Sequence, residues 1–348
     1  MSICSRLNDE GMSMTAPQSP RQSGVTADSG QDIRLLLRAA TMYHLEGATQ
    51  AEIAARLGVS RPTAGRLVSR ARAQGLVTVT VAAPDHLGSS IHPDTERAME
   101  KAFGLDEVLI MDSPADGTPS GDAALGRSGS SVLARRIQPT DTFGFTWGPE
   151  QVAVADALTA RNASCRRVVQ MDGSMSSVDY HTGVDHALSR FSEQLRAQPM
   201  RLIAPLYADA DTVTAMRRDS ILSQPLLAAE NAEVMLFGVG SVSTSTTLFE
   251  GAFIDSAVLG ELENLGAVGE IGGRFYDIDG VPVDSSLVGR TVSVPLDRVH
   301  ECTTTILVSG GAHRQESILG ALRGGFATIL VTDLDTSRWL MSEQKGQR

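Results

Sequence analysis

The sequence predicts an α/β protein with a small N-terminal helix-turn-helix domain and a larger domain built on a parallel sheet. Residues 49–74 show two short helices separated by a glycine turn. After Glu107, apolar strands alternate with helices, as they do in a parallel sheet that is covered on both faces. The length of 348 residues also favours two domains.

The expected boundaries follow these changes of pattern. Residues 1–30 are rich in Ser, Gly, Pro and Gln without periodicity, and we expect them to be disordered. The helix-turn-helix domain is expected at 31–83, a linker and connecting helix at 84–104, the large α/β domain at 105–342, and a short tail at 343–348.

Charge is divided unevenly between these parts. The net charge of −11 argues against a generic nucleic-acid binder. Residues 31–82, however, hold seven arginines against three acidic residues, whereas residues 83–348 hold 21 basic and 35 acidic residues. A basic module on an acidic body favours specific docking on DNA. An acidic protein that merely carries one basic helix is the alternative.

Several classes of protein are not expected. Cys4, Cys165 and Cys302 are far apart and form no CxxC motif, which argues against a disulfide framework and against zinc. No apolar run approaches the roughly 20 residues that cross a membrane. Residues 1–30 also lack the apolar core of a signal peptide. We therefore expect a cytoplasmic protein with no membrane partner.

The first two helices of the small domain have clear local signals. Residues 31–45 place apolar side chains at helical spacing. Thr49 and Glu52 then form a capping box that opens the next helix. Gly58 supplies the left-handed residue that ends it.

The second helix of the motif is expected to enter the DNA major groove. Ser60 caps it and Pro62 is tolerated in its first turn. Its inward face is Ala64, Leu67, Val68 and Ala71, which leaves a basic outer face. The predicted DNA-contacting residues are Gln50, Ser60, Arg61, Pro62, Thr63, Arg66, Ser69 and Arg70. The pattern does not distinguish phosphate contacts from base contacts.

Residues 76–81 alternate valine with threonine and predict a short strand, as in a winged variant of the motif. Residues 93–103 predict a connecting helix. In the large domain, strands are expected at 108–111, 142–146, 168–171, 201–204, 234–239, 304–308 and 328–331. Helices are expected at 122–137, 151–160, 184–196, 212–220, 257–265 and 316–323.

Ligands of such sheets bind at the carboxyl ends of the strands, and unusual loops gather there in this chain. The loop GFTWG contains Thr146, Trp147 and Gly148, whose backbone and hydroxyl groups suit an anion. A packed turn is the alternative. Asp172 and Gly173 end another strand, and Gly240 precedes five hydroxyl residues at 243–247. Such loops suit a polyhydroxylated or phosphorylated ligand.

Two further loops carry arginine. Gly310 and Gly311 end a strand shortly before Arg314, and together they can clamp a phosphate. Residues 269–280 predict a β-hairpin that carries Arg274 and Asp277. This pair suits a sugar phosphate, or alternatively forms a salt bridge that holds the hairpin.

No catalytic, metal or cofactor site is predicted. Asp179, His181, Asp185 and His186 lack metal-ligand spacing on one helix face. The chain has neither a nucleophile elbow nor a phosphate-binding P-loop. Its two lysines, Lys101 and Lys345, lie outside the strand ends, so a Schiff-base lysine is not available there.

Taken together, these segments resemble the SorC family of bacterial sugar-responsive transcriptional regulators over about residues 31–340. The resemblance rests on the helix-turn-helix, FGFTWG, GVGS, GAVGEIGGRFYDIDG and VSGGAHRQESILGALRGGFATILVTD. It implies that residues 105–342 form an effector-binding and oligomerisation domain related to the sugar-phosphate isomerase and deaminase fold. It also implies a phosphorylated sugar or polyol as effector, operator DNA as partner, and a homo-oligomer, either a dimer or a homotetramer.

The resemblance carries ligand roles to Thr146, Trp147, Gly148, Arg274, Asp277, Gly310, Gly311 and Arg314. The family usually has Lys where this chain has Arg314, and arginine keeps the charge but forms no imine. Glu150 stands where the family is often more basic, which leaves room for an unphosphorylated polyol. A sugar-phosphate isomerase or deaminase with a DNA-binding appendage is the alternative function, with Asp172 or Asp277 as its base.

Overall fold

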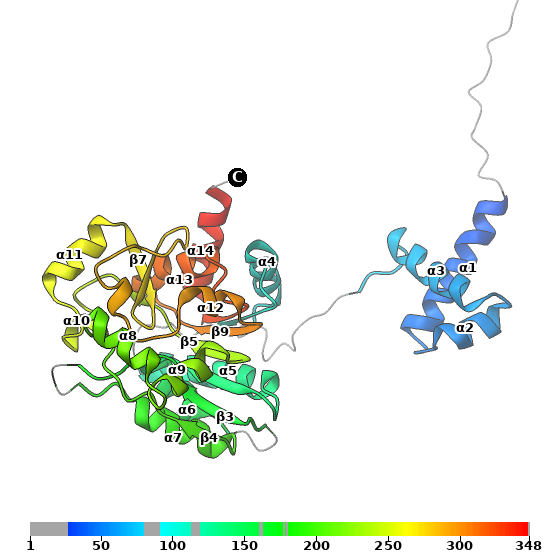
Figure 1. Cartoon of the computed structure of the whole chain (residues 1–348). Coiled ribbons are helices and arrows are strands. Elements are labelled where there is room, and N and C mark those ends of the chain that lie inside the picture. The colour runs from blue at the N-terminus through cyan, green and yellow to red at the C-terminus, as the bar shows by residue number, and fades with distance from the viewer. Residues whose placement is uncertain are drawn as a thin grey trace, which may run out of the picture. The chain divides into compact units, whose positions relative to one another are not determined.

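The computed structural model describes residues 27–79, 91–112, 119–159, 163–176, 178 and 180–346. The chain forms two compact units, Met1–Ala82 and Ala83–Arg348 (Figure 1). Each unit has its own hydrophobic core and is considered by itself. No helix of the described part of the chain is both long enough and apolar enough to cross a bilayer.

The first unit is a bundle of three helices, α1 (Ala27–His44), α2 (Gln50–Leu57) and α3 (Arg61–Ala73). The capping box is present, because Thr49 N donates to Glu52 Oε2 at 2.7 Å and Thr49 Oγ1 accepts from Glu52 N at 3.3 Å. Gly58 ends α2 with φ of +67°, and Ser60 caps α3. The four predicted inward residues of α3 are buried, so its outer face is free for other contacts.

Two expectations for this unit need correction. Helix α1 begins at Ala27, so residues 27–30 are helical where disorder was expected, and residues 1–26 lie outside the described residues. The strand predicted at 76–81 is wrong over residues 76–79, which are not extended into a strand. Leu76 and Val77 pack instead against the helical core, and this explains their apolar character. Residues 80–90, with most of the predicted linker, are outside the described residues.

The second unit contains a seven-stranded parallel sheet in the order β1-β10-β9-β5-β2-β3-β4. These strands are β1 (Glu107–Met111), β2 (Thr142–Phe145), β3 (Arg167–Gln170), β4 (Gln198–Met200), β5 (Val234–Phe237), β9 (Thr304–Val308) and β10 (Ile329–Asp333). The helices are α4 (Pro93–Phe103), α5 (Pro119–Arg136), α6 (Pro149–Ala157), α7 (Val184–Gln194), α8 (Ala210–Arg218), α9 (Ser223–Glu230), α10 (Thr247–Glu250), α11 (Ser256–Asn264), α12 (Leu296–Glu301), α13 (Gln315–Arg323) and α14 (Leu334–Gly346).

The sheet is buried on both faces, as the apolar strands predict. Leu236 of β5 belongs to one hydrophobic cluster, while its neighbours Met235 and Phe237 belong to another. Ile306 and Leu307 of β9 divide between the clusters in the same way. Because successive strand residues point to opposite faces, the two clusters are the two covered faces of one sheet.

A second, antiparallel sheet of three strands joins β6 (Gly240–Ser241), β7 (Ala267–Ile271) and β8 (Arg274–Asp277). The predicted hairpin is therefore present. Its turn consists of Gly272 and Gly273, whose φ angles of +56° and +77° favour glycine.

The predicted strand at 201–204 is shifted, since β4 ends at Met200. Leu202 and Ala204 instead pack with Val213 and Leu226 of α8 and α9, and this gives residues 201–204 their apolar alternation. Every other predicted strand and helix overlaps an observed element. Helices α9, α10, α12 and α14 were not predicted.

Candidate ligand cleft and DNA-binding surface

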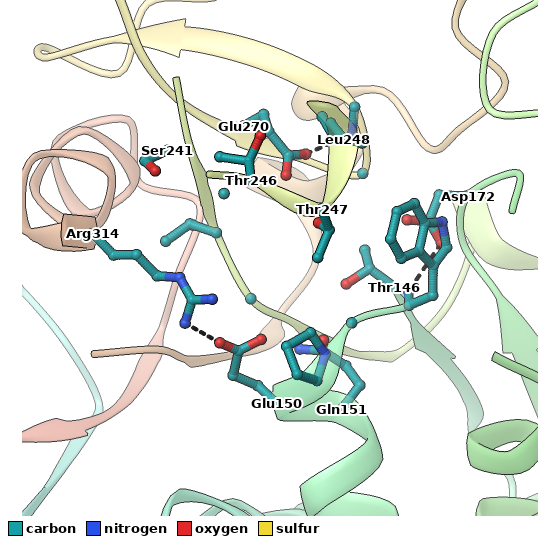
Figure 2. Close-up of a pocket in the computed structure, with 18 of the residues that line it drawn as sticks. Thr146, Glu150, Gln151, Asp172, Ser241, Thr246, Thr247, Leu248, Glu270 and Arg314 are labelled. Atoms are coloured by element: carbon teal, nitrogen blue, oxygen red, sulfur yellow. Dashed lines mark hydrogen bonds and ion pairs between the residues drawn. The ribbon is translucent and has the colours of Figure 1, made fainter. Parts of the chain in front are cut away.

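A cleft lies where strands β2, β3, β5 and β9 end, and it encloses about 650 Å³ including its open mouth. Its lining comes from the loops after these strands, from the 245–248 segment and from the β7–β8 hairpin. The lining residues are Thr146, Trp147, Gly148, Pro149, Glu150, Gln151, Asp172, Gly238, Val239, Gly240, Ser241, Ser245, Thr246, Thr247, Leu248, Glu270, Gly272, Gly273, His313 and Arg314. Figure 2 shows the labelled polar side chains converging on this space.

Trp147 forms one wall of the cleft. Its backbone N donates to Asp172 Oδ1 at 3.3 Å, and its indole Nε1 donates to the carbonyl oxygen of Gly173 at 2.9 Å. The indole also stacks on Phe253, with ring centroids 5.2 Å apart. These hydrogen bonds join the loop that follows β2 to the loop that follows β3.

Glu150 and Arg314 meet on another side of the cleft (Figure 2). Arg314 Nη1 donates to Glu150 Oε1 in an ion pair. The side chain of Glu150 is 7% exposed and that of Arg314 is 21% exposed. Glu150 lies in the first turn of α6, so its carboxylate is also placed at the positive end of a helix dipole.

Gln151, the next residue of α6, is 1% exposed. Its Nε2 has no hydrogen-bond partner among the described residues. A Cβ built on Gly148 would lie 2.7 Å from Gln151 Oε1, and one on Gly238 would lie 3.3 Å from Nε2. The two glycines therefore leave the space that the amide occupies. Buried polar groups are normally satisfied, so this amide is a candidate ligand contact.

Glu270 projects from β7, and the hairpin turn holds it. Its Oε2 accepts from Gly273 N at 2.7 Å. A Cβ on Gly240 would lie 2.2 Å from Glu270 Oε1, so a side chain at that position is incompatible with this carboxyl. Burial raises the pKa of Glu270 to about 7, against the opposing effects of the Gly273 amide and the Arg314 charge.

Asp172 follows β3 and is 2% exposed. Burial raises its pKa well above the usual value, and the neighbouring charge of Glu270 raises it further. A carboxyl accepts hydrogen bonds and, when it is protonated, also donates one. The carboxyls of Asp172 and Glu270 therefore suit a ligand that is rich in hydroxyl groups.

The outer face of α3 forms a separate surface in the first unit. Gln50, Ser60, Arg61, Pro62, Arg66, Ser69 and Arg70 are exposed, and Thr63 is partly exposed. The side chain of Gln50 lies against Gly65, where an added Cβ would sit 3.3 Å from Gln50 Oε1. Gln50 therefore belongs to the same face as α3 although it comes from α2.

The arginines of this face differ in their surroundings. Arg70 Nη2 donates to Asp32 Oδ2 at 2.8 Å, which neutralises part of its charge. Thr63 Oγ1 lies 2.8 Å from Ser60 Oγ within the cap of α3. Arg61 and Arg66 form no ion pair with any described residue. They are the cations of this face that are most available to DNA phosphates or to base edges.

Both units match models of known protein families. A family model described as "Putative sugar-binding domain" matches residues 91–342, and one described as "MarR family" matches residues 39–86. The chain belongs to the SorC family of sugar-binding transcriptional regulators.

Curated relatives of this SorC-family chain span its whole architecture. It is 29% identical to the deoxyribonucleoside regulator of Bacillus subtilis, over 89% of this chain and 98% of the relative. It is 26% identical to the erythritol catabolism regulatory protein EryD of Brucella abortus, over 91% and 99%. The full-length sorbitol operon regulator SorC of Klebsiella pneumoniae is 27% identical, and its crystal structure superposes with a TM-score of 0.67 over 89% of this chain and 99% of that one. All three relatives are named as regulators.

Six of the predicted effector residues of this SorC-family chain line the cleft: Thr146, Trp147, Gly148, Asp172, Gly240 and Arg314. Gly173 lies behind the lining and accepts the Trp147 hydrogen bond. The sequence thus predicted loops that the fold brings together at one cleft, because the carboxyl ends of parallel strands meet at one edge. Their role in binding a ligand stays a prediction.

Besides Gly173, four predicted effector residues lie outside the lining. Arg274 is turned away, and its guanidinium donates to the carbonyl oxygens of Thr291, Ser293 and Val294 at 3.0–3.2 Å. Asp277 does not form the alternative salt bridge with Arg274, and its Oδ1 instead accepts from the backbone N of residues 279 and 281 in a turn.

Gly310 and Gly311 lie outside the cleft lining, and the amide of Gly311 is paired within the protein. The backbone N of Gly311 donates to Asp333 Oδ2 at 2.7 Å and to Thr336 Oγ1 at 3.0 Å. This amide therefore joins the loop after β9 to the start of α14. Its N–H is already donated to the carboxylate of Asp333.

Gln151 and Glu270 are cleft residues that the sequence reasoning missed. Gln151 follows the GFTWG loop in the first turn of a predicted helix, and Glu270 precedes a Gly-Gly turn. The helix start and the Gly-Gly turn beside these two residues were visible in the sequence. The sequence did not show that the two side chains point into the cleft.

Among the described residues no group of His, Cys, Asp or Glu is arranged to hold a metal ion. His186 pairs with Asp156 at 2.6 Å, and Asp179 lies outside the described residues.

Proposed function

We propose that a sugar or polyol bound in the Trp147 cleft controls the affinity of the α3 surface for operator DNA, in the cytoplasm. The proposal is supported by three relatives whose names refer to sorbitol, erythritol and deoxyribonucleosides. Sorbitol and erythritol carry one hydroxyl group on every carbon atom, and deoxyribonucleosides carry hydroxyl groups on a sugar ring. Such compounds match a cleft lined by hydroxyls, carboxyls and one amide.

The observation that carries the proposal is the Gln151 amide. It is buried, its Nε2 is unpartnered among the described residues, and it lines the cleft. Leaving a buried donor without an acceptor costs about 1–3 kcal/mol. A ligand hydroxyl that accepts from Nε2 recovers this cost, so the cleft is suited to a polar ligand.

Control of DNA binding requires that the ligand favours one arrangement of the molecule over another. We infer that the active species is a homo-oligomer, a dimer or a tetramer, with recognition helices on successive half-sites. In symmetric dimers such half-sites are about 34 Å apart. A ligand that changes this spacing changes operator affinity without contacting DNA.

We further propose that the chain has no catalytic activity and needs no metal or cofactor. The alternative is a sugar-phosphate isomerase or deaminase. Of its two candidate bases, Asp172 lines the cleft and Asp277 is occupied in a turn. Turnover of ribose 5-phosphate or glucosamine 6-phosphate that is lost in Asp172→Asn would establish the enzyme instead.

A melting assay with a panel of polyols and sugars tests the proposal. A ligand at about 100 times its dissociation constant should stabilise the protein by about 2.7 kcal/mol. Gln151→Met should lose most of this stabilisation and retain operator binding. The matched control is Gln224→Met on the exposed part of α9, which should behave as the wild type. Full ligand stabilisation in Gln151→Met would contradict the assignment of the cleft.

A further inference from the structure

We propose that the cleft selects an uncharged polyol or sugar and rejects its phosphate ester, because Glu150 occupies the position where an anion would bind. This inference rests on the proposed function, since it names the ligand class of the same cleft. It makes Glu150 the residue that determines specificity.

Two groups in the cleft attract anions. A helix N-terminus and an arginine are the usual receptors of a phosphate group. In this cleft they are the N-terminus of α6, at Pro149 and Glu150, and the guanidinium of Arg314. The chain brings both groups to one place, and its own carboxylate is already there.

The carboxylate of Glu150 fills the space between Arg314 and the loop after β5. Glu150 Oε1 accepts from Arg314 Nη1. A Cβ on Gly238 would lie 3.4 Å from Glu150 Oε2, so the second oxygen lies against the β5 loop. The residue is 5% exposed. Removing one partner from a buried ion pair leaves an uncompensated charge, so a phosphate gains little by competing for Arg314.

Five of the described residues that line the cleft have ionisable side chains. They are Glu150, Asp172, Glu270, His313 and Arg314. Burial and the adjacent Arg314 lower the pKa of His313, so it adds no second cation at neutral pH. The raised pKa values of Asp172 and Glu270 reduce their negative charge, so Glu150 is the carboxylate that balances the single permanent cation, Arg314. A dianionic ester therefore meets no net positive charge in this lining.

The other polar groups of the cleft can bind a neutral ligand. Thr146, Ser241 and residues 245–247 supply hydroxyls, and Gln151 supplies an unpartnered donor. Carboxyl oxygens of Asp172 and Glu270 accept from ligand hydroxyls without a change in net charge. Each of these groups serves a polyol, and none of them requires a phosphate.

The test uses matched ligand pairs on the full-length protein. Sorbitol is compared with sorbitol 6-phosphate, erythritol with erythritol 4-phosphate, and ribose with ribose 5-phosphate, by thermal melting and by operator binding. We expect at least one neutral parent to bind about tenfold or more tightly than its ester. An ester that binds as tightly as its parent overturns the inference and leaves the proposed function standing. Six compounds without effect on melting or operator binding count against both.

A second arm uses inorganic phosphate and does not depend on the identity of the ligand. Phosphate stabilises most proteins weakly by exclusion from their surface, so the control Glu263→Gln, an exposed position on α11, measures that general effect. Glu150→Gln frees Arg314 and should gain a phosphate-dependent rise in Tm beyond the control. Glu150→Ser provides a second variant should Glu150→Gln fold poorly. Equal phosphate shifts in wild type, control and both Glu150 variants overturn the inference.

Discussion

The indole Nε1 of Trp147 donates a 2.9 Å hydrogen bond to the carbonyl oxygen of Gly173. This bond joins the loop after β2 to the loop after β3 directly beside the cleft. Because the indole also stacks on Phe253, a ligand that touches this wall changes the surroundings of a tryptophan. We therefore expect the fluorescence of Trp147 to report ligand binding at this wall.

Trp147→Phe should keep much of the stacking and lose the hydrogen bond. The buried carbonyl of Gly173 then lacks its donor, and we expect a loss of about 2 kcal/mol in the free energy of unfolding. Intrinsic fluorescence should respond to ligand in the wild type and not in this variant. The other tryptophan provides the control, since Trp339→Phe should retain the response. A response that survives in Trp147→Phe and disappears in Trp339→Phe would place the ligand elsewhere.

The raised pKa of Glu270 predicts that the stability of the protein depends on pH. Its folded pKa is raised to about 7, above its ordinary value, so the folded state binds this proton more tightly than the unfolded state. The resulting stabilisation is present below the unfolded pKa and is lost as pH rises toward about 7. Relative to Glu270→Gln, the wild type should therefore lose Tm between about pH 5 and about pH 8. A constant difference in Tm across this range would contradict the buried, partly protonated carboxyl.

Arg274 should prove to be a structural residue. Its guanidinium donates to three carbonyl oxygens of residues 291–294, and this segment supports Asp172 through the Gly173 N to Val292 O hydrogen bond of 2.8 Å. Arg274→Met removes three part-buried hydrogen bonds, although Ser293 O and Val294 O keep longer bonds from Arg217 Nη2 and Ser293 Oγ, and we expect about 3 kcal/mol of destabilisation in urea unfolding. Arg298→Met, which breaks an exposed i,i+3 pair with Glu301, should cost about 0.5 kcal/mol or less. A stable Arg274→Met that fails only to bind ligand would restore its predicted ligand role.

The exposed position of Arg66 predicts that it contributes to operator affinity and to the dependence of that affinity on salt concentration. Arg66→Ala should weaken operator binding, and a lost phosphate contact should reduce the salt slope by about one. A lost base contact should instead cost about 1–3 kcal/mol for the preferred operator and relax sequence preference. Arg298→Ala serves as the control on the other unit. Unchanged affinity and an unchanged salt slope in Arg66→Ala would remove α3 from the interface.

The sequence predicted best those features that are encoded locally. The Thr49–Glu52 capping box, the left-handed Gly58 and the Ser60 cap each involve residues within a few positions, so the helix-turn-helix was predictable without tertiary information. The parallel sheet was predictable from its apolar strands, because burial on both faces leaves little polar alternation.

Long-range pairings were not predictable. Arg314 lines the cleft as predicted, but its pairing with Glu150, which lies 164 positions away in the chain, could not be foreseen. The Gly311 amide meets Asp333, and Arg274 meets carbonyl oxygens of residues 291–294, which lie outside the hairpin. A glycine or arginine in a strand-end loop has the same local pattern whether it faces the cleft or the core. Only the fold decides between these directions, which is why Glu270 and Gln151 were missed.

The central claim is that occupancy of the Trp147 cleft controls operator binding, and fluorescence anisotropy of labelled operator DNA tests it most directly. The polyol or sugar that gives the largest shift in melting is added to the protein–operator complex at fixed salt. The account predicts a change of about fivefold or more in operator affinity, and the operator must change ligand affinity by the same factor. A ligand that binds, as reported by Trp147 fluorescence, and leaves operator affinity unchanged would contradict the account.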